Sequence, residues 1–335
     1  MVAGMVMVDG EPLLVVVLGP TASGKTSLSI QLAERFAGEI VSCDSVAVYR
    51  GMEIGTAKPS REERARVPHH LINVYEVDEH STAGDYARRA RKAIAEITAR
   101  GHLPIVTGGT GLYLRALLEG LFPGPQRSEE LRERLLRSHG KRGAGWLRRI
   151  LERLDRVAAE RIHANDVPKL IRAIEVSLAA KRPMSEAWKD GREPLTGYRV
   201  LQIGLEPERQ ALYARINARA KQMFDAGLED ETRELLAKYG EGSRALDSLG
   251  YRQARAVLRG EMTREAAIAA AQQGHRNYAK RQQTWFRREP EVHWLHGFGE
   301  DAGVAAEAEE LVEQALGGSS RDNAEPVQEG ANKRV

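Results

Sequence analysis

Apolar and polar residues follow two alternating patterns along the first third of the chain. Four short apolar runs have the length of buried strands: residues 13–18, 39–43, 68–74 and 103–106. Between these runs, apolar residues recur three or four positions apart, after residue 26 and again over residues 86–97, which predicts helices. Alternating strands and helices indicate βαβ units around a parallel sheet. In such a sheet the carboxyl ends of the strands share one edge, where ligands bind.

The pattern changes at the Pro-Gly-Pro sequence of residues 123–125. From there to about residue 195 the periodicity is helical, and one stripe is especially regular: Leu147, Ile150, Leu151, Leu154 and Val157. A second helix is predicted over residues 170–178, and an apolar run at residues 199–205 returns to the strand pattern. We therefore predict a helical insertion at residues 123–196, which interrupts a core formed by residues 1–122 and 197–316.

The last third of the chain has helical periodicity. One predicted helical stripe consists of Leu212, Ile216, Met223, Phe224 and Leu228. Arg215 and Arg219 lie one helical turn apart beside this stripe. A further helix is predicted over residues 265–288. Residues 317–335 carry no apolar periodicity, which is typical of a disordered tail.

Composition narrows the class of protein. The 335 residues are 42% hydrophobic and carry a formal net charge of +3, as expected of an ordinary globular protein with two structural units. Cys43 is the only cysteine, which excludes an intramolecular disulfide and a cysteine-based zinc site. No apolar stretch reaches the roughly 18–20 residues of a membrane span, and the first ten residues lack the basic start of a signal peptide. These features favour a cytoplasmic protein without membrane contact.

The first predicted strand leads directly into a glycine-rich loop with the spacing G-x-x-x-x-G-K-[ST]. The loop consists of Gly19, Pro20, Thr21, Ala22, Ser23, Gly24, Lys25 and Thr26. Its amides and the start of the following helix would face a phosphate, Lys25 supplies a mobile charge, and the Thr26 hydroxyl is placed to ligate Mg²⁺. The sequence therefore predicts a di- or triphosphate site. The predicted fold class is α/β, with a P-loop NTPase-like parallel sheet flanked by helices and an all-helical insertion.

The acidic residue that positions the metal in an ATPase, GTPase or kinase does not occur at its usual place in this sequence. In those proteins a second apolar strand ends in Asp, whereas residues 103–106 lead into Thr107-Gly108-Gly109-Thr110. Asp44 instead follows the strand at residues 39–43, which makes it available as a base beside the phosphate. An N-cap or turn role for Asp44 is the alternative. The pair His69 and His70 has no cysteine or acidic pattern nearby, which favours packing and hydrogen bonding over metal binding.

A basic segment near the end of the chain indicates nucleic acid. Residues 275–288 contain five Lys or Arg residues and no acid, with aromatic residues between them. Arginines for phosphates and aromatic rings for stacking are what recognition of single-stranded RNA requires. The alternative is an amphipathic helix with a solvated basic face and with Trp285 and Phe286 in the core.

Seven short motifs occur in a defined order along the chain. They are GPTASGKT at residues 19–26, DSVAVYRGMEIGTAKP at 44–59, PHHL at 68–71, GGTGLY at 108–113, ND with RAIE within 165–175, LGYR at 249–252 and KRQQTWFR at 280–287. On these motifs the chain up to about residue 300 resembles the tRNA dimethylallyltransferase family, also called isopentenyl-diphosphate:tRNA transferases. The run GMEIGTAKP is far more specific than the phosphate loop.

The resemblance implies transfer of a dimethylallyl group from dimethylallyl diphosphate to the exocyclic amine of the adenosine 3′-adjacent to the tRNA anticodon (position 37). The phosphate loop, with Mg²⁺ on Thr26, would then hold a diphosphate leaving group, and Arg215 and Arg219 would clamp it from the other side. Asp44 would remove the amine proton, and Thr110 would bind the diphosphate or hold Asp44 in place. The label ATP-binding would describe the loop motif but not the substrate.

The resemblance also implies a set of positions that touch the tRNA anticodon stem-loop. They are Asp44, Ser45, Val46, Ala47, Thr110, Arg132, Pro168, Lys169, Leu170, Ile171, Arg172, Asp247, Ser248, Leu249, Gly250, Tyr251, Arg252, Lys280, Arg281, Gln282, Gln283, Thr284, Trp285, Phe286 and Arg287. The insertion would grip the RNA backbone, and we expect a monomer. Two positions depart from the family: Ala47 stands where Gln is common, and Lys169 stands where Arg is common.

Three other functions stay open at this point. They are an adenylate isopentenyltransferase that acts on free AMP, a P-loop small-molecule kinase or NTPase, and an RNA-binding switch that senses nucleotide without catalysis. The Arg-rich insertion and the basic segment at residues 280–288 favour tRNA over AMP.

Overall fold

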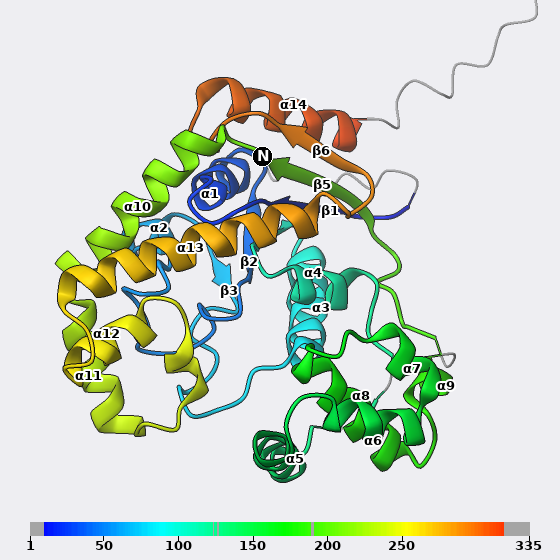
Figure 1. Cartoon of the computed structure of the whole chain (residues 1–335). Helices are drawn as coiled ribbons and strands as arrows, with labels where there is room; N and C mark the ends of the chain where they lie inside the picture. The colour runs from blue at the N-terminus through cyan, green and yellow to red at the C-terminus, as the bar shows by residue number, and fades with distance from the viewer. Residues whose placement is uncertain (1–9, 123, 126, 189–190, 318–335) are drawn as a thin grey trace, which may run out of the picture. The chain divides into compact units, whose positions relative to one another are not determined.

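A parallel sheet of six strands forms the centre of the larger of two compact units (Figure 1). The computed structural model describes residues 10–122, 124–125, 127–188 and 191–317. Of these, residues 10–117 and 196–317 form one unit, and the described part of residues 118–195 forms the other. Each unit has a hydrophobic core of its own.

The strands of the sheet lie in the order β3-β2-β4-β1-β5-β6, and every neighbouring pair is parallel. Their bounds are Leu13–Leu18 for β1, Gly38–Cys43 for β2, His69–His70 for β3, Leu103–Gly108 for β4, Arg199–Leu205 for β5 and Val292–Leu295 for β6. The register pairs both Leu18 and Cys43 with Gly108, so β1, β2 and β4 end at the same level. The predicted parallel sheet with flanking helices is confirmed.

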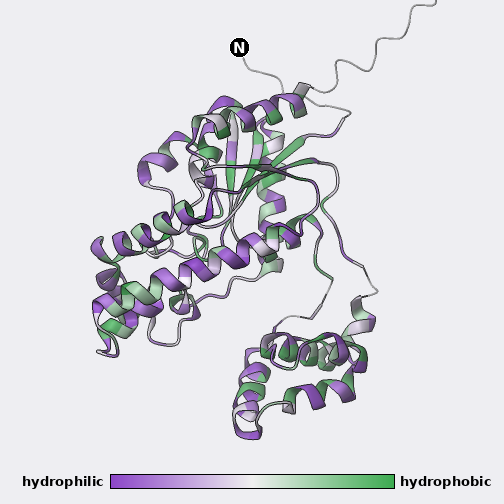
Figure 2. Cartoon of the chain, turned by 45° about the horizontal axis from the view of Figure 1, so that its top comes forward, coloured by the Kyte–Doolittle hydropathy of each residue, from purple (hydrophilic) through white to green (hydrophobic). Residues whose placement is uncertain are grey.

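Helices cover the sheet and extend beyond its edge. They are α1 (Lys25–Arg35), α2 (Arg61–Arg66), α3 (Ala83–Ala99), α4 (Gly111–Leu118), α10 (Arg209–Asp225), α11 (Leu228–Tyr239), α12 (Tyr251–Leu258), α13 (Arg264–Phe286) and α14 (Ala302–Gly317), with a short 3₁₀ helix at Arg244–Asp247. Figure 2 shows the strands as largely hydrophobic, whereas the helices around them carry hydrophobic and hydrophilic residues together. The helices are therefore amphipathic, and their apolar residues pack against the apolar sheet.

Two buried clusters hold these elements together. In the first, Val15 and Val17, alternate residues of β1, belong with Leu28 of α1 and Val312 of α14, as the two-residue period of a strand predicts. In the second, Phe224 of α10 belongs with residues of α11, α12, α13 and the segment after β2. Helix α10 also packs against α13. The second cluster thereby fixes α10 and α13 relative to the segment that follows β2.

The smaller unit is helical throughout its described elements. They are α5 (Glu129–Arg142), α6 (Trp146–Leu154), α7 (Arg156–Arg161), α8 (Val167–Ala180) and α9 (Met184–Ala187). Leu147 and Leu151 of α6 share a buried cluster with Leu170 and Ile174 of α8. The spacing of these residues is the helical period on which the prediction of an all-helical insertion was based.

The predicted strand at residues 68–74 is wrong beyond His70. Only His69 and His70 pair with β2, because Leu71 and Asn73 have φ angles of 61° and 57°. Left-handed backbone of this kind cannot continue a strand. The two histidines do hydrogen-bond within the fold as expected, His69 to the Val67 carbonyl at 2.8 Å and His70 to Glu39 at 2.6 Å.

Two predicted helical stripes cross helix boundaries. The Asp155 side chain accepts a hydrogen bond from the amide of Ala158 and caps α7, so Val157 lies in a new helix and is 48% exposed. Similarly, Gly227 has a φ angle of 96° and separates α10 from Leu228, the first residue of α11. Leu228 nevertheless packs in the same buried cluster as Phe224.

The end of the chain also differs from the prediction. Strand β6, which pairs with β5, was missed in a part of the sequence predicted to be helical. Helix α14 includes Gly317, so the predicted tail begins one position inside a helix, and residues 318–335 lie outside the described residues. Among the described helices, none has the length and apolar character that a bilayer span requires.

Candidate functional site

A cleft of about 670 Å³ lies over the carboxyl ends of β1, β2 and β4. It is lined by residues 21–27 of the phosphate loop, residues 44–47 after β2 and residues 107–109 at the end of β4. Helices α10, α12 and α13 and the segment before α12 contribute further lining residues: Arg215, Arg219, Asp247, Ser248, Leu249, Arg252, His275, Tyr278, Arg281 and Gln282. The predicted meeting of the three strand-end segments in one crevice is confirmed.

The phosphate loop is packed closely enough to require glycine at position 24. Gly24 has a φ angle of 86°, and a Cβ atom there would lie 2.5 Å from the amide nitrogen of Gly299. Next to it, Lys25 donates from Nζ to the Pro20 carbonyl at 2.7 Å. Burial and the neighbouring Arg219 lower the pKa of Lys25 to about 8, although Asp44 partly offsets them. The loop therefore holds a cation that burial destabilises and that a bound anion would stabilise.

The two predicted clamp arginines lie differently. Arg219 donates from Nη1 to the Thr21 hydroxyl at 3.3 Å, so it already contacts the phosphate loop. Arg215 instead forms an ion pair with Glu300 at 2.9 Å and lies over the Phe298 ring at 3.9 Å. Glu300 is an acid at the phosphate loop that sequence reasoning missed, because its contact with Arg215 spans 85 positions. Arg215 is therefore already paired with an acid where it lines the cleft, and its role as a clamp stays a prediction.

The Asp44 carboxylate is held at the end of β2 by its own turn. Oδ1 accepts hydrogen bonds from the amides of Val46 at 2.8 Å and Ala47 at 3.2 Å. Asp44 therefore does stabilise a turn, as the alternative prediction has it, but only through Oδ1. Among the described residues, no hydrogen bond reaches Oδ2. This second oxygen is the one that could accept a substrate proton.

Thr110 joins the turn after β4 to the turn after β2. Its Oγ1 accepts a hydrogen bond from the amide of Ser45 at 3.1 Å, and its own amide donates to the Cys43 carbonyl at 3.2 Å. These contacts bracket Asp44 from both sides in sequence. Of the two roles expected for Thr110, the geometry therefore favours holding Asp44 in place.

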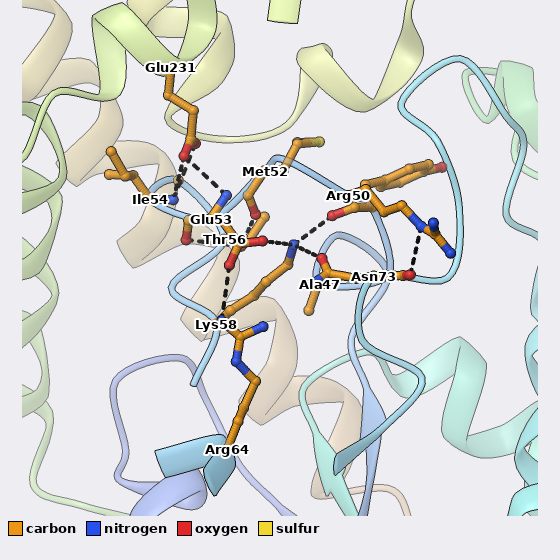
Figure 3. A network of polar contacts seen from close by, with 12 residues as sticks. Ala47, Arg50, Met52, Glu53, Ile54, Thr56, Lys58, Arg64, Asn73 and Glu231 are labelled. Carbon is orange, nitrogen blue, oxygen red and sulfur yellow. Dashed lines mark hydrogen bonds and ion pairs between the residues drawn. The ribbon is translucent and has the colours of Figure 1, made fainter. Parts of the chain in front are cut away.

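The motif at residues 51–59 contains a buried lysine, Lys58, which Figure 3 shows with its hydrogen-bond partners. The Lys58 side chain is 1% exposed and donates to the Tyr49 carbonyl at 2.5 Å, to Glu53 at 3.0 Å and to Asn73 at 2.5 Å. The amide of Asn73 in turn donates to the Ala47 carbonyl at 3.2 Å. Lys58 thereby supports the end of the Asp44 turn.

The same motif is anchored on its other side by a glutamate of α11. Glu231 accepts hydrogen bonds from the amides of Glu53 and Ile54 at 3.1 and 3.0 Å (Figure 3), and the Tyr251 hydroxyl also donates to it. Sequence reasoning identified this motif as specific without assigning it a role. In the structure, the partly buried Glu231 holds two backbone amides of the motif, and the buried Lys58 side chain ties the motif to Tyr49 and Asn73.

The predicted RNA-contact residues near α12 and α13 fall into two sets. The exposed set is Asp247, Arg252, Lys280, Arg281, Thr284 and Arg287, and Ser248, Leu249, Gln283 and Trp285 are partly exposed. The buried set is Gly250, Tyr251, Gln282 and Phe286. These four positions are largely enclosed by protein, although Gln282 also lines the cleft, and RNA contact at these positions stays a prediction. Phe286 in the core agrees with the alternative predicted for this segment, and the exposed face of α13 is basic.

The predicted RNA-contact residues of the helical unit include two arginines that converge on a buried acid. Glu175 is 1% exposed, and its carboxylate lies 2.8 Å from Nη1 of Arg172 and 3.7 Å from Nε of Arg132. Pro168 and Lys169 are exposed at the start of α8, whereas Leu170 and Ile171 are buried. Leu170 and Ile171 are part of the core of this unit, and RNA contact at this segment stays a prediction.

Known proteins share both the sequence and the fold of this chain. The family model described as IPP transferase matches residues 47–289. A tRNA dimethylallyltransferase of Koribacter versatilis (strain Ellin345) is 67% identical over 302 residues, which cover 90% of this chain and 98% of the relative.

Solved structures agree. The full-length tRNA isopentenylpyrophosphate transferase from Bacillus halodurans is 37% identical, with a TM-score of 0.68 and coverage of 92% of this chain and 98% of that chain. A eukaryotic dimethylallyltransferase described as acting on tRNA has the same fold, with a TM-score of 0.77, 24% identity and coverage of 91% of this chain and 79% of that chain. These matches confirm the resemblance carried by the seven motifs, and the chain belongs to the IPP transferase family.

Proposed function

We propose that this protein transfers a dimethylallyl group from dimethylallyl diphosphate to the exocyclic amine of the adenosine at tRNA position 37. The products are N6-(dimethylallyl)adenosine and diphosphate. The observation that carries the proposal is the shared cleft, which brings Lys25, Arg219 and Asp44 together at the ends of three adjacent strands. Two cations suit a diphosphate leaving group, and one carboxylate suits an amine that must lose a proton. The relatives named tRNA dimethylallyltransferase support tRNA as the acceptor.

Stabilisation of the leaving group follows from the phosphate loop. As the bond from the allylic carbon to the diphosphate oxygen breaks, negative charge accumulates on the diphosphate. The amides of residues 24–26 at the start of α1 would face this charge, and Lys25 and Arg219 add two positive charges. Fixed donors in a partly enclosed cleft act without reorganising at the moment of reaction. We assign the diphosphate to this loop.

We propose that the Thr26 hydroxyl is a ligand of Mg²⁺. Thr26 lies in the first turn of α1 and lines the cleft. Among the described residues, no cluster of three or more His, Cys, Asp or Glu side chains could hold a metal. A single hydroxyl ligand fits Mg²⁺, because proteins often hold this ion by few side chains together with substrate phosphates and water. When bound, the ion would neutralise charge on the departing diphosphate.

Activation of the acceptor falls to Asp44. An adenine amine is a weak nucleophile because its lone pair is delocalised into the ring. As the bond between this nitrogen and the allylic carbon forms, the nitrogen loses a proton, and Asp44 Oδ2 is the acceptor that we assign. The Val46 and Ala47 amides keep the carboxylate in place through Oδ1. General bases of this kind contribute a factor of about 10²–10⁴ to the rate.

The acceptor RNA would approach the cleft along the basic side of α13. Lys280 and Arg281 are exposed there, and Arg281 and Arg252 also line the cleft. The target base must leave its stack to reach Asp44, at a cost of a few kcal/mol. At Ala47 the family's common Gln side chain is missing, so recognition of the base falls to other groups. We further propose that the helical unit binds the stem-loop backbone and that the protein works as a cytoplasmic monomer.

Mass spectrometry of nucleosides tests the proposed function. The protein is incubated with dimethylallyl diphosphate and Mg²⁺, together with either an anticodon stem-loop carrying adenosine at position 37 or AMP. We expect a dimethylallyl mass gain on adenosine from the RNA and none on AMP, with a stem-loop carrying guanosine at position 37 unmodified. Transfer to AMP alone would overturn the tRNA proposal. Release of ADP from ATP without prenyl transfer would indicate a kinase or NTPase instead.

A further inference from the structure

Gln282 of α13 is enclosed at the place where the phosphate loop meets the turn after β4. It is 5% exposed. Its Oε1 accepts a hydrogen bond from the amide of Thr21 at 2.8 Å, and its Nε2 donates to the Gly109 carbonyl at 2.9 Å. The two bonds span 261 and 173 positions of sequence. One side chain therefore connects two loops that follow the adjacent strands β1 and β4.

The two partners of Gln282 have opposite hydrogen-bonding polarity. The Thr21 amide can only donate, and the Gly109 carbonyl can only accept. An uncharged amide side chain satisfies both at once, whereas a carboxylate would serve only the donor and a lysine or arginine only the acceptor. Because Thr21 N is occupied by Gln282, this amide is also unavailable to a phosphate. Pro20 has no N–H and the Ser23 amide donates to the Pro20 carbonyl at 3.4 Å, so the amides at Gly24, Lys25 and Thr26 are the ones that we assign to the ligand.

The contact is so close that a side chain at position 109 would displace the Gln282 amide. A Cβ atom on Gly109 would lie 2.0 Å from Nε2 of Gln282. The Tyr278 hydroxyl donates to the same Gly109 carbonyl at 3.4 Å, and burial, with the charge of Asp44, raises its pKa to about 12. Farther along the turn, a Cβ atom on Gly111 would lie 2.3 Å from the Trp285 ring. One face of α13 thus lies directly on the turn that carries Thr110.

We propose that Gln282 is a positioning residue that sets the distance between the phosphate loop and the Thr110 turn, and that it does not contact RNA. The inference deepens the proposed function, since these two loops would hold the diphosphate and the Asp44 base. Its neighbours Lys280, Arg281 and Thr284 are exposed on the same helix. Helix α13 would therefore carry RNA contacts on one face and hold the catalytic loops on the other.

The test measures diphosphate binding and RNA binding separately in variants of Gln282. Gln282→Met fills a similar volume without either hydrogen bond, and Gln282→Asn keeps the amide but is too short to reach both loops. Calorimetry measures inorganic diphosphate binding, with Mg²⁺ and without RNA, and a filter assay measures stem-loop binding without diphosphate. We expect both variants to weaken diphosphate binding about tenfold and to change stem-loop binding less than about twofold. In turnover, KM for the donor rises and kcat falls, while KM for RNA is unchanged.

Gln273→Met is the matched control, because it removes an exposed glutamine of the same helix that is not among the predicted RNA-contact residues. We expect it to keep the diphosphate affinity of the unsubstituted protein. The proposal is overturned if Gln282→Met weakens RNA binding alone, if it keeps full diphosphate affinity, or if Gln273→Met weakens diphosphate binding as strongly. Equal loss of both affinities with a lower Tm would also overturn it, in favour of a purely structural role. Because binding is measured without transfer, a failure of the unsubstituted protein to prenylate RNA would count against the proposed function alone.

Discussion

Arg219 of α10 donates a hydrogen bond to the Thr21 hydroxyl of the phosphate loop, although the two residues are 198 positions apart in sequence. This contact brings a second cation into the cleft next to Lys25. Burial and the proximity of Arg219 lower the pKa of Lys25 to about 8. The two positive charges destabilise each other without an anion, and a bound diphosphate would relieve that repulsion.

Donor capture is expected to depend on the charge of Lys25. Below pH 8 the ammonium is charged and attracts the diphosphate, and above pH 8 it is increasingly neutral. We therefore expect kcat/KM for dimethylallyl diphosphate, which reports on the free enzyme, to fall as pH rises through about 8. Steady-state kinetics over a pH series measure this fall.

Arg219→Gln should shift the pH dependence of kcat/KM for dimethylallyl diphosphate to higher pH. Loss of the Arg219 charge removes one of the causes that lower the Lys25 pKa, so the fall in kcat/KM shifts to higher pH. KM for the donor also rises, because one cation of the cleft is lost. Arg233→Gln, on the outer surface of α11, serves as the control and should leave the inflection near pH 8. An inflection that does not move in Arg219→Gln would contradict the coupling.

Asp44→Asn should separate catalysis from binding. The Asn carbonyl can still accept from the Val46 and Ala47 amides, so the turn is kept, but the amide cannot take a proton. We expect the single-turnover rate to fall by a factor of about 10²–10⁴ while stem-loop affinity stays within about twofold. Rapid-quench assays near pH 7 measure the rate, since loss of the Asp44 charge also lowers the Lys25 pKa. A variant with the full rate would rule Asp44 out as the base.

Much of the sheet could be predicted because its strands are apolar on both faces. β1 is a continuous apolar run, and β2, β4 and β5 each contain a short apolar run, as strands of a covered parallel sheet should. β3 was overestimated because the left-handed backbone of Leu71 and Asn73 has no signal in hydrophobic periodicity. β6 was missed because it is four residues long and contains the polar residue His293.

The site was predictable only where neighbouring residues form it. The phosphate loop and the Asp44 turn are local sequences whose spacing carries their geometry. The partners of Arg215 and Gln282 come from segments 85 and up to 261 positions away, and periodicity does not encode such pairings. Gln282 therefore looked like part of a basic RNA-binding run, whereas its burial is a property of the tertiary structure.

Lys58→Met should destabilise the protein, because the Lys58 side chain is buried and makes several hydrogen bonds. The variant leaves the Tyr49 carbonyl and the Asn73 side chain without their buried donor. We expect the free energy of unfolding to fall by about 3 kcal/mol, since unsatisfied buried acceptors cost about 1–3 kcal/mol each. Urea denaturation measures the change. Lys92→Met removes a lysine that is 79% exposed, and it should change stability by less than about 0.5 kcal/mol.

RNA affinity should depend unequally on the basic residues of the last motif. Lys280 and Arg281 are exposed on α13, whereas Arg287 is already held by Glu206 at 2.6 Å. Each lost phosphate contact reduces the slope of log K against log salt by about 0.7–0.9. We therefore expect Lys280→Ala with Arg281→Ala to lower the slope by about 1.5, and Arg287→Ala to change it much less. Titration of a labelled stem-loop at several salt concentrations measures the slopes. Equal slopes for all variants would mean that the exposed face of α13 does not meet the RNA backbone.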